Sequence, residues 1–441
     1  MIARQAGGIL DFKSAKVAKG KGSVARIYFA ATGSRFWRAC ADYDPMIIAI
    51  LLPWSTSFVV FVLILWLFAI FPRLDTSFLT TLRHPVSLSA LALVGIATLG
   101  VLWGEGPWWP RLLAIGPVTK LLFLPLLLFH YQRSARAHWV LWGFIGSCSA
   151  LMLYSFALYF FPELRLVSVS AFYNEGIPVR NAIDQNQEFA FCAFAILLFA
   201  IEAFRRGRAR LGLTLIALAS LFFINIFFIA LARTSVIYIA ALGLILAARL
   251  LPLKAAALAA VILVAGMATV WEASPYLRGR ILHIAVEYQE FRDNNEPTST
   301  GLRLQYWNSA IRWTAEKPVL GHGTGAARRL YDEAAEGKEG AWGHKIGNPH
   351  NQLLFVSIEW GFIGCVLLLL MWWRHYAHFR EEGIVALIGA IIVTQNVFSS
   401  LFNSHIFDFT EGWMYVFGVG VAGGAIMRKH RKERAFGCGS R

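Results

Sequence analysis

The sequence predicts an all-α fold, a polytopic membrane bundle of about twelve transmembrane helices. Hydrophobic residues make up 57% of the 441-residue chain, which is more apolar than a soluble domain usually is. Apolar runs of about 20 residues, the length that lets a helix cross the hydrocarbon core, recur through the sequence. These runs lack the alternating pattern of outer-membrane barrel strands. The spans are therefore expected to be helical.

The predicted spans follow the apolar runs in order. A single helix across residues 46–71 would place the strongly basic N-terminus outside, against the usual charge bias. We therefore expect two short spans there, separated by an outer turn at residues 53–56. The expected spans are 36–53, 57–71, 86–103, 111–130, 138–161, 187–204, 211–231, 234–249, 255–271, 350–373, 384–402 and 408–427.

Basic residues determine the predicted orientation. The chain holds 41 Lys and Arg against 26 Asp and Glu, and the basic residues gather in short clusters such as 205–210 and 428–434, as is typical of cytoplasmic segments. This orientation places both termini inside and the long segment 272–349 outside. Because membrane topology explains the formal charge of +15, nucleic-acid binding is not expected.

The chain is expected to have five parts. The segment 272–349 differs in composition from the spans, because it is charged and rich in Gly. Within it, residues 303–316 show helical apolar spacing that ends at Lys317-Pro318. The parts are a basic cytoplasmic tail over 1–45, spans one to nine over 36–271, the large outer loop 272–349, the last three spans over 350–427 and a basic tail over 428–441.

The most informative motif is Asn348-Pro349-His350-Asn351, which opens an apolar run. Asn is a favoured N-cap and Pro a favoured first helical residue, so we expect His350 in the first turn of a helix at the outer membrane surface. The helix N-terminus would disfavour an imidazolium and keep His350 neutral, able to act as a general base. The alternative is a histidine that only caps the helix or donates a hydrogen bond. Asn351 is a weaker candidate.

Two glycines follow on the same predicted helix. At 100° per residue, Gly361 and Gly364 would fall on the face of His350 and deeper in the membrane. Such a face would form a groove that admits a neighbouring helix or a lipid chain.

Several polar side chains near apolar runs are candidate anion ligands. Arg233 lies within an apolar stretch, where it must mark a turn at the outer interface, and its guanidinium suits bidentate phosphate contacts. Arg303 begins the predicted loop helix, and Lys120 lies inside a span. Arg180 and Asn186, near an outer loop, are weaker candidates. The alternatives are snorkelling, surface or paired side chains.

Metal and cofactor chemistry is not predicted. The outer loop has no DxD pair, and His322, His344 and His350 do not form an HExxH arrangement. The five cysteines are scattered without a CxxC pair, which argues against a zinc site or a disulfide framework. Walker and dinucleotide motifs are missing, so ATP-driven transport is not expected.

The motifs resemble those of a known family. His350-Asn351, nine further residues, Gly361 and Gly364 match the pattern H[NSQ]x9GxxG, and the sequence thereby resembles the O-antigen ligases. Residues 303–325 resemble that family's loop pattern of an Arg, a Trp and a Pro followed by G-x-G-x-G. Arg233 before Thr-Ser resembles the family's arginine at an outer helix junction. The resemblance covers roughly residues 180–430.

The resemblance implies a GT-C-like helical bundle in the bacterial inner membrane, capped by a large periplasmic loop. It implies transfer of a glycan from undecaprenyl pyrophosphate to a sugar hydroxyl of lipid A-core, with inversion and without a metal or cofactor. His350 would be the general base, and Arg233 and Arg303 would bind the pyrophosphate. Lys120 would correspond to a cation in an early span. The implied partners are the lipid-linked glycan, the lipid A-core acceptor and membrane lipids.

Other activities remain open at this point. O-antigen or exopolysaccharide polymerases and protein O-oligosaccharyltransferases use the same donor with different acceptors. The H[NSQ]x9GxxG match favours a ligase over a polymerase, and an extra C-terminal soluble domain that would favour a protein acceptor is not seen. A transporter of lipid-linked glycans would share the basic residues and the spans, but it would not need a neutral histidine.

Overall fold

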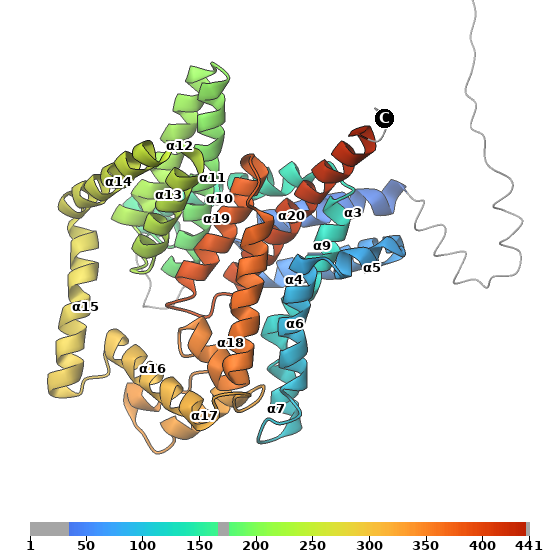
Figure 1. Ribbon diagram of the computed structural model, residues 1–441. Coiled ribbons are helices and arrows are strands. Elements are labelled where there is room, and N and C mark those ends of the chain that lie inside the picture. The colour runs from blue at the N-terminus through green and yellow to red at the C-terminus, as the bar shows by residue number, and fades with distance from the viewer. Residues whose placement is uncertain (1–34, 166–175, 438–441) are drawn as a thin grey trace, which may run out of the picture.

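The computed structural model describes residues 35–165 and 176–437, in which helices joined by loops are the regular elements and no strand is present (Figure 1). A helix lies at each predicted span. Most of the predicted basic tail over 1–45 and the last residues of the second tail lie outside the described residues. The helices are α3 (Arg35–Leu51), α4 (Thr56–Ile70), α5 (Ser77–Leu82), α6 (Pro85–Leu99), α7 (Trp108–Leu113), α8 (Gly116–Thr119), α9 (Phe123–Tyr131), α10 (Ala137–Phe160), α11 (Ala182–Arg205), α12 (Ala209–Phe228), α13 (Ser235–Leu250), α14 (Leu253–Ala273), α15 (Pro275–Asn294), α16 (Ser299–Glu316), α17 (Ala326–Ala335), α18 (Gln352–His378), α19 (Ile384–Ser399) and α20 (Phe409–Gly437).

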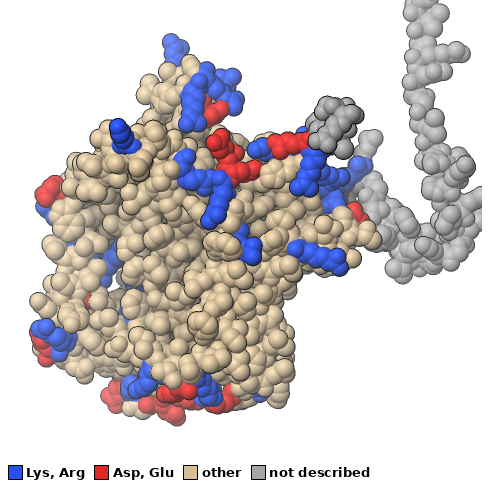
Figure 2. All heavy atoms as spheres, viewed as in Figure 1, with Lys and Arg blue, Asp and Glu red and all other residues tan. Residues whose placement is uncertain are grey.

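The composition of the helices and the distribution of charge fit a multi-pass membrane protein. Among the described residues, seven helical stretches are long and apolar enough to cross a membrane, and three shorter apolar helices accompany them. Figure 2 shows a broad uncharged belt between two charged ends. The arginines at the junction of α11 and α12 lie at the upper end, whereas the lower end, below α16 and α17, carries both signs of charge.

The predicted span 111–130 is interrupted. Residues Trp108–Tyr131 form one apolar stretch, but α7, α8, a 3-10 turn over Lys120–Leu122 and α9 divide it. Gly116 and Pro117 stand at the first break, where proline cannot donate the backbone hydrogen bond that would continue α7. Hydropathy identifies the stretch but does not show this break.

Helix α18 is folded back on itself. Gly361 has φ 58° and ψ −152°, outside the helical region. Cys365 Sγ lies 3.6 Å from the carbonyl oxygen of Leu353, twelve residues earlier, whereas a straight helix would separate these residues by about 18 Å. The chain therefore reverses at Gly361. Residues 352–360 form a first arm, and residues 362–378 form a second, antiparallel arm.

The loop between α16 and α17 holds this reversal in place. The backbone N–H groups of His322 and Gly323 donate to the carbonyls of Ile358 and Glu359, each at 2.8 Å. In return, Phe362 N donates to Pro318 O at 2.8 Å, and Ile363 N donates to Val319 O at 3.3 Å. Positive φ values at glycines 321, 323 and 325 allow the loop to follow the turn this closely.

The second arm of α18 packs antiparallel to α6. At the turn, Trp360 Nε1 donates to Thr324 Oγ1 at 2.9 Å, and Thr324 N donates to Gly100 O at 3.0 Å. At the far end, His375 Nε2 lies 3.0 Å from Val86 O, near the start of α6. The turn at Gly361 therefore lies at the end of the molecule that carries α17.

The outer-loop segment contains α15, α16 and α17. The prediction that a helix ends before Lys317-Pro318 is confirmed, because α16 ends at Glu316 with Lys317 as its C-cap. The carboxylate of Glu359 receives hydrogen bonds from Gly325 N at 2.6 Å and Ala327 N at 2.8 Å. It thereby caps α17 and stabilises the positive end of that helix.

Candidate functional site

His350 lies in a loop before α18. The helix begins at Gln352, and its N-cap is Asn351, whose Oδ1 accepts from Leu354 N at 3.0 Å. The prediction of an N-cap at Asn348 with His350 in the first turn is therefore wrong. Asn348 Oδ1 instead accepts from His350 N at 2.8 Å, a turn that this residue type favours, and His350 takes a left-handed φ of 54°.

The ring of His350 is held by Asn403. Its Nδ1 lies 3.0 Å from Asn403 Oδ1. Since an amide oxygen only accepts, Nδ1 carries the proton and Nε2 is left as the basic atom. Burial lowers the pKa of His350, and the nearby charge of Arg303 lowers it further, against the effects of Asn403 and Asp408. The imidazole is thus neutral at neutral pH, chiefly because it is buried.

The predicted glycine groove is not formed. Gly361 and His350 lie at opposite ends of the first arm, and Gly361 is at the end of the molecule that carries α17, so the predicted order of depth is wrong. A Cβ at Gly361 would collide with the backbone of Val319 and Gly321, which fills the space next to the glycine. Gly364 lies on the second arm against side chains of the first. Both glycines serve the reversal of α18.

Arg233 lies in the predicted turn, between the end of α12 and the start of α13. Its Nη1 and Nη2 donate to the two carboxylate oxygens of Glu287, each at 2.8 Å. Burial would raise the pKa of Glu287, but the hydrogen bonds from Arg233 and Thr300 lower it to about 2. The arginine therefore already has a carboxylate partner.

Arg303 has no such partner. It is half-buried in the first half of α16 and makes no hydrogen bond or ion pair with another described residue. Burial lowers its pKa, as does the neighbouring charge of Arg233, whereas Glu287 raises it. A guanidinium stays charged under these influences. With Arg233 and Glu287 it leaves a net positive charge beside His350.

Lys120 supports the loop between α19 and α20. The side chain is 6% exposed, and its Nζ donates to the carbonyl oxygens of Phe407, at 3.1 Å, and Asp408. The structure therefore places Lys120 against residues 407 and 408 of this loop.

The three weaker candidates have different surroundings. Arg180 donates to Leu52 O at 2.8 Å and lies 3.6 Å from Asp184. Asn186 is fully buried on α11, and neither atom of its amide group has a partner among the described residues. Asn351 caps α18 and donates to the carbonyl of Leu401 at 2.9 Å. Of these side chains, only Arg180 reaches the cavity beside His350.

A cavity of about 300 Å³ opens beside His350. It gathers residues from the start of α4, the start of α11, the loop before α18 and the loop between α19 and α20. All of these junctions are predicted to lie on the same side of the membrane. Its lining residues are Thr56, Arg180, Asn181, Ile183, Asp184, Asn348, His350, Asn403, Asp408, Phe409, Thr410 and Glu411.

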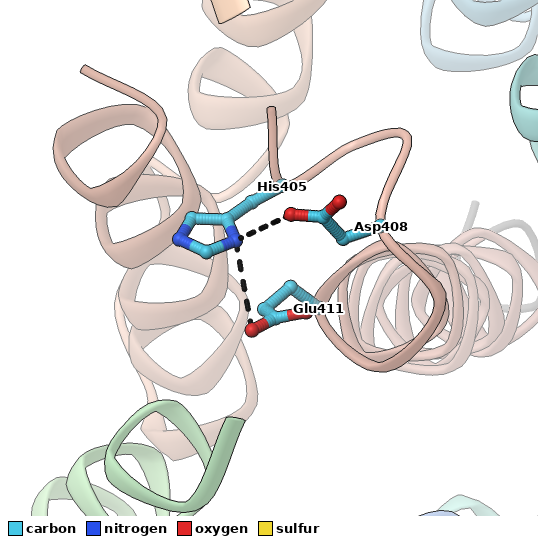
Figure 3. Close-up of side chains that lie close together, drawn as sticks. All are labelled: His405, Asp408 and Glu411. Atoms are coloured by element: carbon cyan, nitrogen blue, oxygen red, sulfur yellow. Dashed lines mark ion pairs between the residues drawn. The ribbon is translucent and has the colours of Figure 1, made fainter. Parts of the chain in front are cut away.

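The loop between α19 and α20 supplies much of the cavity, although its residues are not among the site residues predicted from the sequence. A signal was available, because Asn403, His405, Asp408 and Glu411 interrupt two apolar spans at short intervals. Figure 3 shows His405 pointing at both carboxylates: its Nδ1 lies 3.2 Å from Asp408 Oδ2 and 3.6 Å from Glu411 Oε1.

This cluster has donor types that a divalent cation accepts, and its donor atoms lie within 4.8 Å of one another. The ammonium group of Lys120 sits against the same loop and would oppose an added cation. Absence of a metal remains a prediction.

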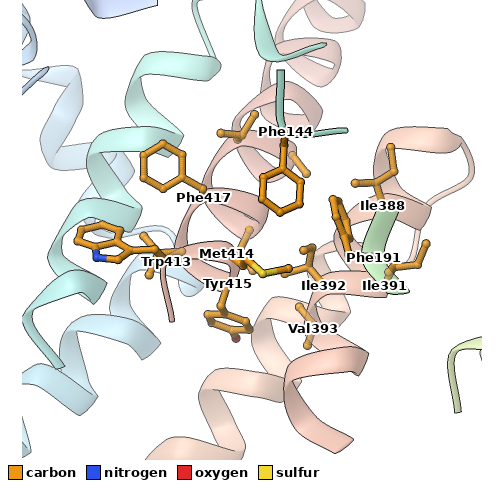
Figure 4. Packing of buried hydrophobic residues seen from close by; sticks show 14 of the residues in the cluster. Phe144, Phe191, Ile388, Ile391, Ile392, Val393, Trp413, Met414, Tyr415 and Phe417 are labelled. Atoms are coloured by element: carbon orange, nitrogen blue, oxygen red, sulfur yellow. The ribbon is translucent and has the colours of Figure 1, made fainter. Parts of the chain in front are cut away.

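An apolar core closes the site beyond Glu411. On α20, Met414 follows Glu411 by one helical turn and points among Phe144, Phe191 and Ile392, from α10, α11 and α19 (Figure 4). These four side chains are buried, at 7% exposure or less. The apolar core therefore begins one helical turn beyond Glu411 on this face of α20.

Comparison with known proteins agrees with the motifs. Residues 218–369 match the family model described as O-antigen ligase, a segment that includes Arg233, Arg303 and His350. A Haemophilus influenzae protein described as uncharacterized is 27% identical over 127 residues, which cover 27% of this chain and 30% of that protein. The chain thus matches less than a third of that relative's length. The match over residues 218–369 confirms the resemblance of this part of the chain to the O-antigen ligase family.

Proposed function

We propose that this chain is an O-antigen ligase, which transfers a glycan from undecaprenyl pyrophosphate to a sugar hydroxyl of lipid A-core. The observation that carries the proposal is the state of His350. Asn403 fixes its Nδ1–H at 3.0 Å, burial keeps the ring neutral, and the side chain lines a polar cavity. A positioned, neutral imidazole is suited to deprotonate an acceptor hydroxyl.

The proposed reaction is a single displacement. His350 Nε2 accepts the proton of the acceptor hydroxyl while the oxygen forms a bond to the anomeric carbon of the donor sugar. The bond between that carbon and the pyrophosphate oxygen breaks, and its electron pair leaves with the pyrophosphate. Attack from the face opposite the leaving group inverts the anomeric configuration.

We propose Arg303 as the cation that meets the pyrophosphate directly. It is half-buried, has no partner among the described residues and lies close enough to His350 to lower its pKa. Developing charge on a leaving phosphate is stabilised by fixed cations in such surroundings. Arg233 adds positive charge beside Arg303, but Glu287 engages both of its Nη groups. Arg233 therefore serves mainly to position this side of the site.

We place the reaction at the periplasmic face of the bacterial inner membrane, with residues 272–349 as the periplasmic loop. The basic clusters at 205–210 and 428–434 support this orientation. The cavity residues come from junctions at the opposite end of the predicted spans. No metal or cofactor is needed for the step, because the proton and the leaving charge both have protein groups to receive them.

The test uses purified protein in lipid vesicles, supplied with an undecaprenyl-pyrophosphate-linked glycan and lipid A-core. The variant His350→Ala should keep its affinity for the donor and lose transfer, whereas the control His344→Ala, at an exposed histidine of the same loop, should keep both. Transfer by His350→Ala would disprove the role of the base. If the wild type moves donor across the membrane without any transfer, the chain is a transporter instead.

The identity of the acceptor is tested in a strain that lacks this protein, by the pattern of its lipopolysaccharide on a gel. Free core together with accumulated lipid-linked polymer is the result expected of a ligase. Core that carries a single repeat unit would assign the chain as a polymerase. An unchanged pattern with loss of a glycoprotein would assign it to protein glycosylation.

A further inference from the structure

We infer that the cavity beside His350 is the subsite of the acceptor sugar, and that it takes an uncharged sugar ring with free hydroxyls. The inference rests on the glycan transfer proposed above. It adds which substrate occupies which side of His350, a point that the motifs do not address.

The charge on the cavity wall argues against the pyrophosphate as its occupant. Asp184, Asp408 and Glu411 line the cavity, and Arg180 is the only cation among its lining residues. The Nη1 atom of Arg180 lies 3.6 Å from Asp184, so this charge is already paired. Carboxylates repel a phosphate at short range. The unpaired Arg303 is not among the lining residues, so the cation proposed to meet the pyrophosphate lies outside this cavity.

The cavity wall contains carboxylate oxygens that can accept further hydrogen bonds. Asp184 Oδ2 accepts from Thr410 Oγ1 at 3.1 Å, and the Asp184 carboxylate also shares a hydrogen bond with the carboxyl group of Glu411. In Asp408, Oδ2 faces His405, whereas Oδ1 has no hydrogen bond with a described residue. Because each carboxylate oxygen has two lone pairs, both Asp184 and Asp408 can accept a further hydrogen bond from a hydroxyl.

The wall also offers free donors. The side-chain oxygens of Asn181, Asn348 and Asn403 are already used, by the N-terminal N–H groups of α11, by His350 N and by His350 Nδ1. Their Nδ2 groups make no hydrogen bond within the described chain. A sugar hydroxyl both donates and accepts, so a ring that carries several of them matches this mixture of groups.

The size and remaining surface of the cavity fit the same occupant. A volume of about 300 Å³ is at the lower end of the range for small-molecule sites, so the cavity suits a sugar residue rather than a polymer. The ring of Phe409 lies in the wall and offers an apolar surface to the C–H groups of a sugar. A hydroxyl of that sugar would then meet the base that also lines the cavity.

The experiment separates the acceptor from the donor. In vesicles that contain the protein, transfer from an undecaprenyl-pyrophosphate-linked oligosaccharide to lipid A-core is measured together with slow hydrolysis of the donor by water. The variants Asp184→Asn and Asp408→Asn are assayed at about pH 8, where His350 is neutral in the wild type and in both variants. Each should raise the KM for lipid A-core by about tenfold, the effect of one weakened charge-assisted hydrogen bond. Donor KM and hydrolysis should be unchanged.

The matched control is Asp293→Asn, at an exposed carboxylate of α15. It should change neither the donor KM nor the acceptor KM. If the two cavity variants raise donor KM or slow hydrolysis while acceptor KM is constant, the cavity holds the donor and the inference is wrong. Failure of the wild type to transfer or hydrolyse at all would instead reject the proposed function. Asp408→Asn provides the same test if Asp184→Asn does not fold.

Discussion

Arg233 and Glu287 are joined by two hydrogen bonds of 2.8 Å between the α12–α13 junction and α15. The pair fastens the predicted periplasmic loop to the helical bundle. It also gives Arg233 a carboxylate partner that its local sequence does not reveal, whereas its role as a phosphate ligand stays a prediction.

Glu287→Gln should loosen this attachment. The loss of a charge-assisted pair is expected to lower the free energy of unfolding by roughly 1–3 kcal/mol, measured as a lower thermal midpoint in detergent. Because the folded-state pKa of Glu287 is lowered to about 2, the pair contributes fully above the ordinary carboxyl pKa of about 4.3 and is lost as pH falls toward 2. The difference between wild type and variant should therefore shrink over that range. The control Glu290→Gln should be as stable as the wild type. If the stability difference between the wild type and Glu287→Gln is constant from pH 7 to about pH 2, the charged pair does not stabilise the fold.

Arg303→Lys should impair donor use more than it impairs stability. Lysine keeps the charge but loses the planar fork that meets phosphate oxygens in pairs, so we expect kcat/KM for the donor to fall about tenfold or more. Arg312→Lys, on the exposed side of the same helix, is the matched control. Equal activity of both variants would show that Arg303 does not contact the pyrophosphate.

Asn403→Ala should change the pH dependence of transfer. Asn403 raises the pKa of His350 through its hydrogen bond, against the lowering effects of burial and Arg303. Without it the pKa falls further, and the acidic limb of the pH profile, where the base becomes protonated, should move to lower pH. Loss of the anchor at Nδ1 should also lower kcat by roughly tenfold. A variant with a lower kcat and an unmoved acidic limb would mean that Asn403 does not act through His350.

Gly361→Ala should disrupt the reversal of α18. A Cβ there has no room against the backbone of Val319, and the positive φ adds strain. We expect a loss of stability of about 2 kcal/mol or more, seen as a lower thermal midpoint and a lower yield of folded protein. Gly95→Ala is the control, because a Cβ on that helical glycine meets open space. Equal stability of the two variants would argue against the turn.

Chelation should leave transfer unchanged. We expect the protein treated with EDTA to keep its rate, because the proposed step uses His350 and Arg303 and needs no metal. Elemental analysis of the purified protein should find no stoichiometric zinc or magnesium. An activity that EDTA removes and one of these ions restores would assign the cluster of His405, Asp408 and Glu411 as a metal site.

The sequence predicted the helices better than the path of the chain between them. Apolar runs identify helices because burial in lipid demands continuous hydrophobicity, and each predicted span contains one. The same criterion cannot detect the reversal at Gly361, because both arms of α18 are apolar. Gly361 was interpreted as a packing residue, although glycine also permits the positive φ that such a turn needs.

The sequence predicted only those site residues that stand out in their local surroundings. His350 and Arg303 belong to local motifs, and each stands out in an apolar or aromatic setting. Asn403 lies 53 positions from His350, and nothing in the local pattern of either residue shows that they meet. Side-chain partners set by tertiary packing, such as Glu287 for Arg233, are likewise invisible in a single sequence.

The reversal of α18 connects the outer-loop segment, residues 272–349, to the position of His350. Residues 318–323 are bonded through their backbone to residues 358–363, and Trp307 Nε1 donates to Pro349 O at 2.9 Å. These two attachments lie at opposite ends of the nine-residue arm 352–360. Both ends of the arm are therefore held by α16 and the loop that follows it. This segment thus helps to fix the position of His350, although no residue of α16 or α17 lines the cavity.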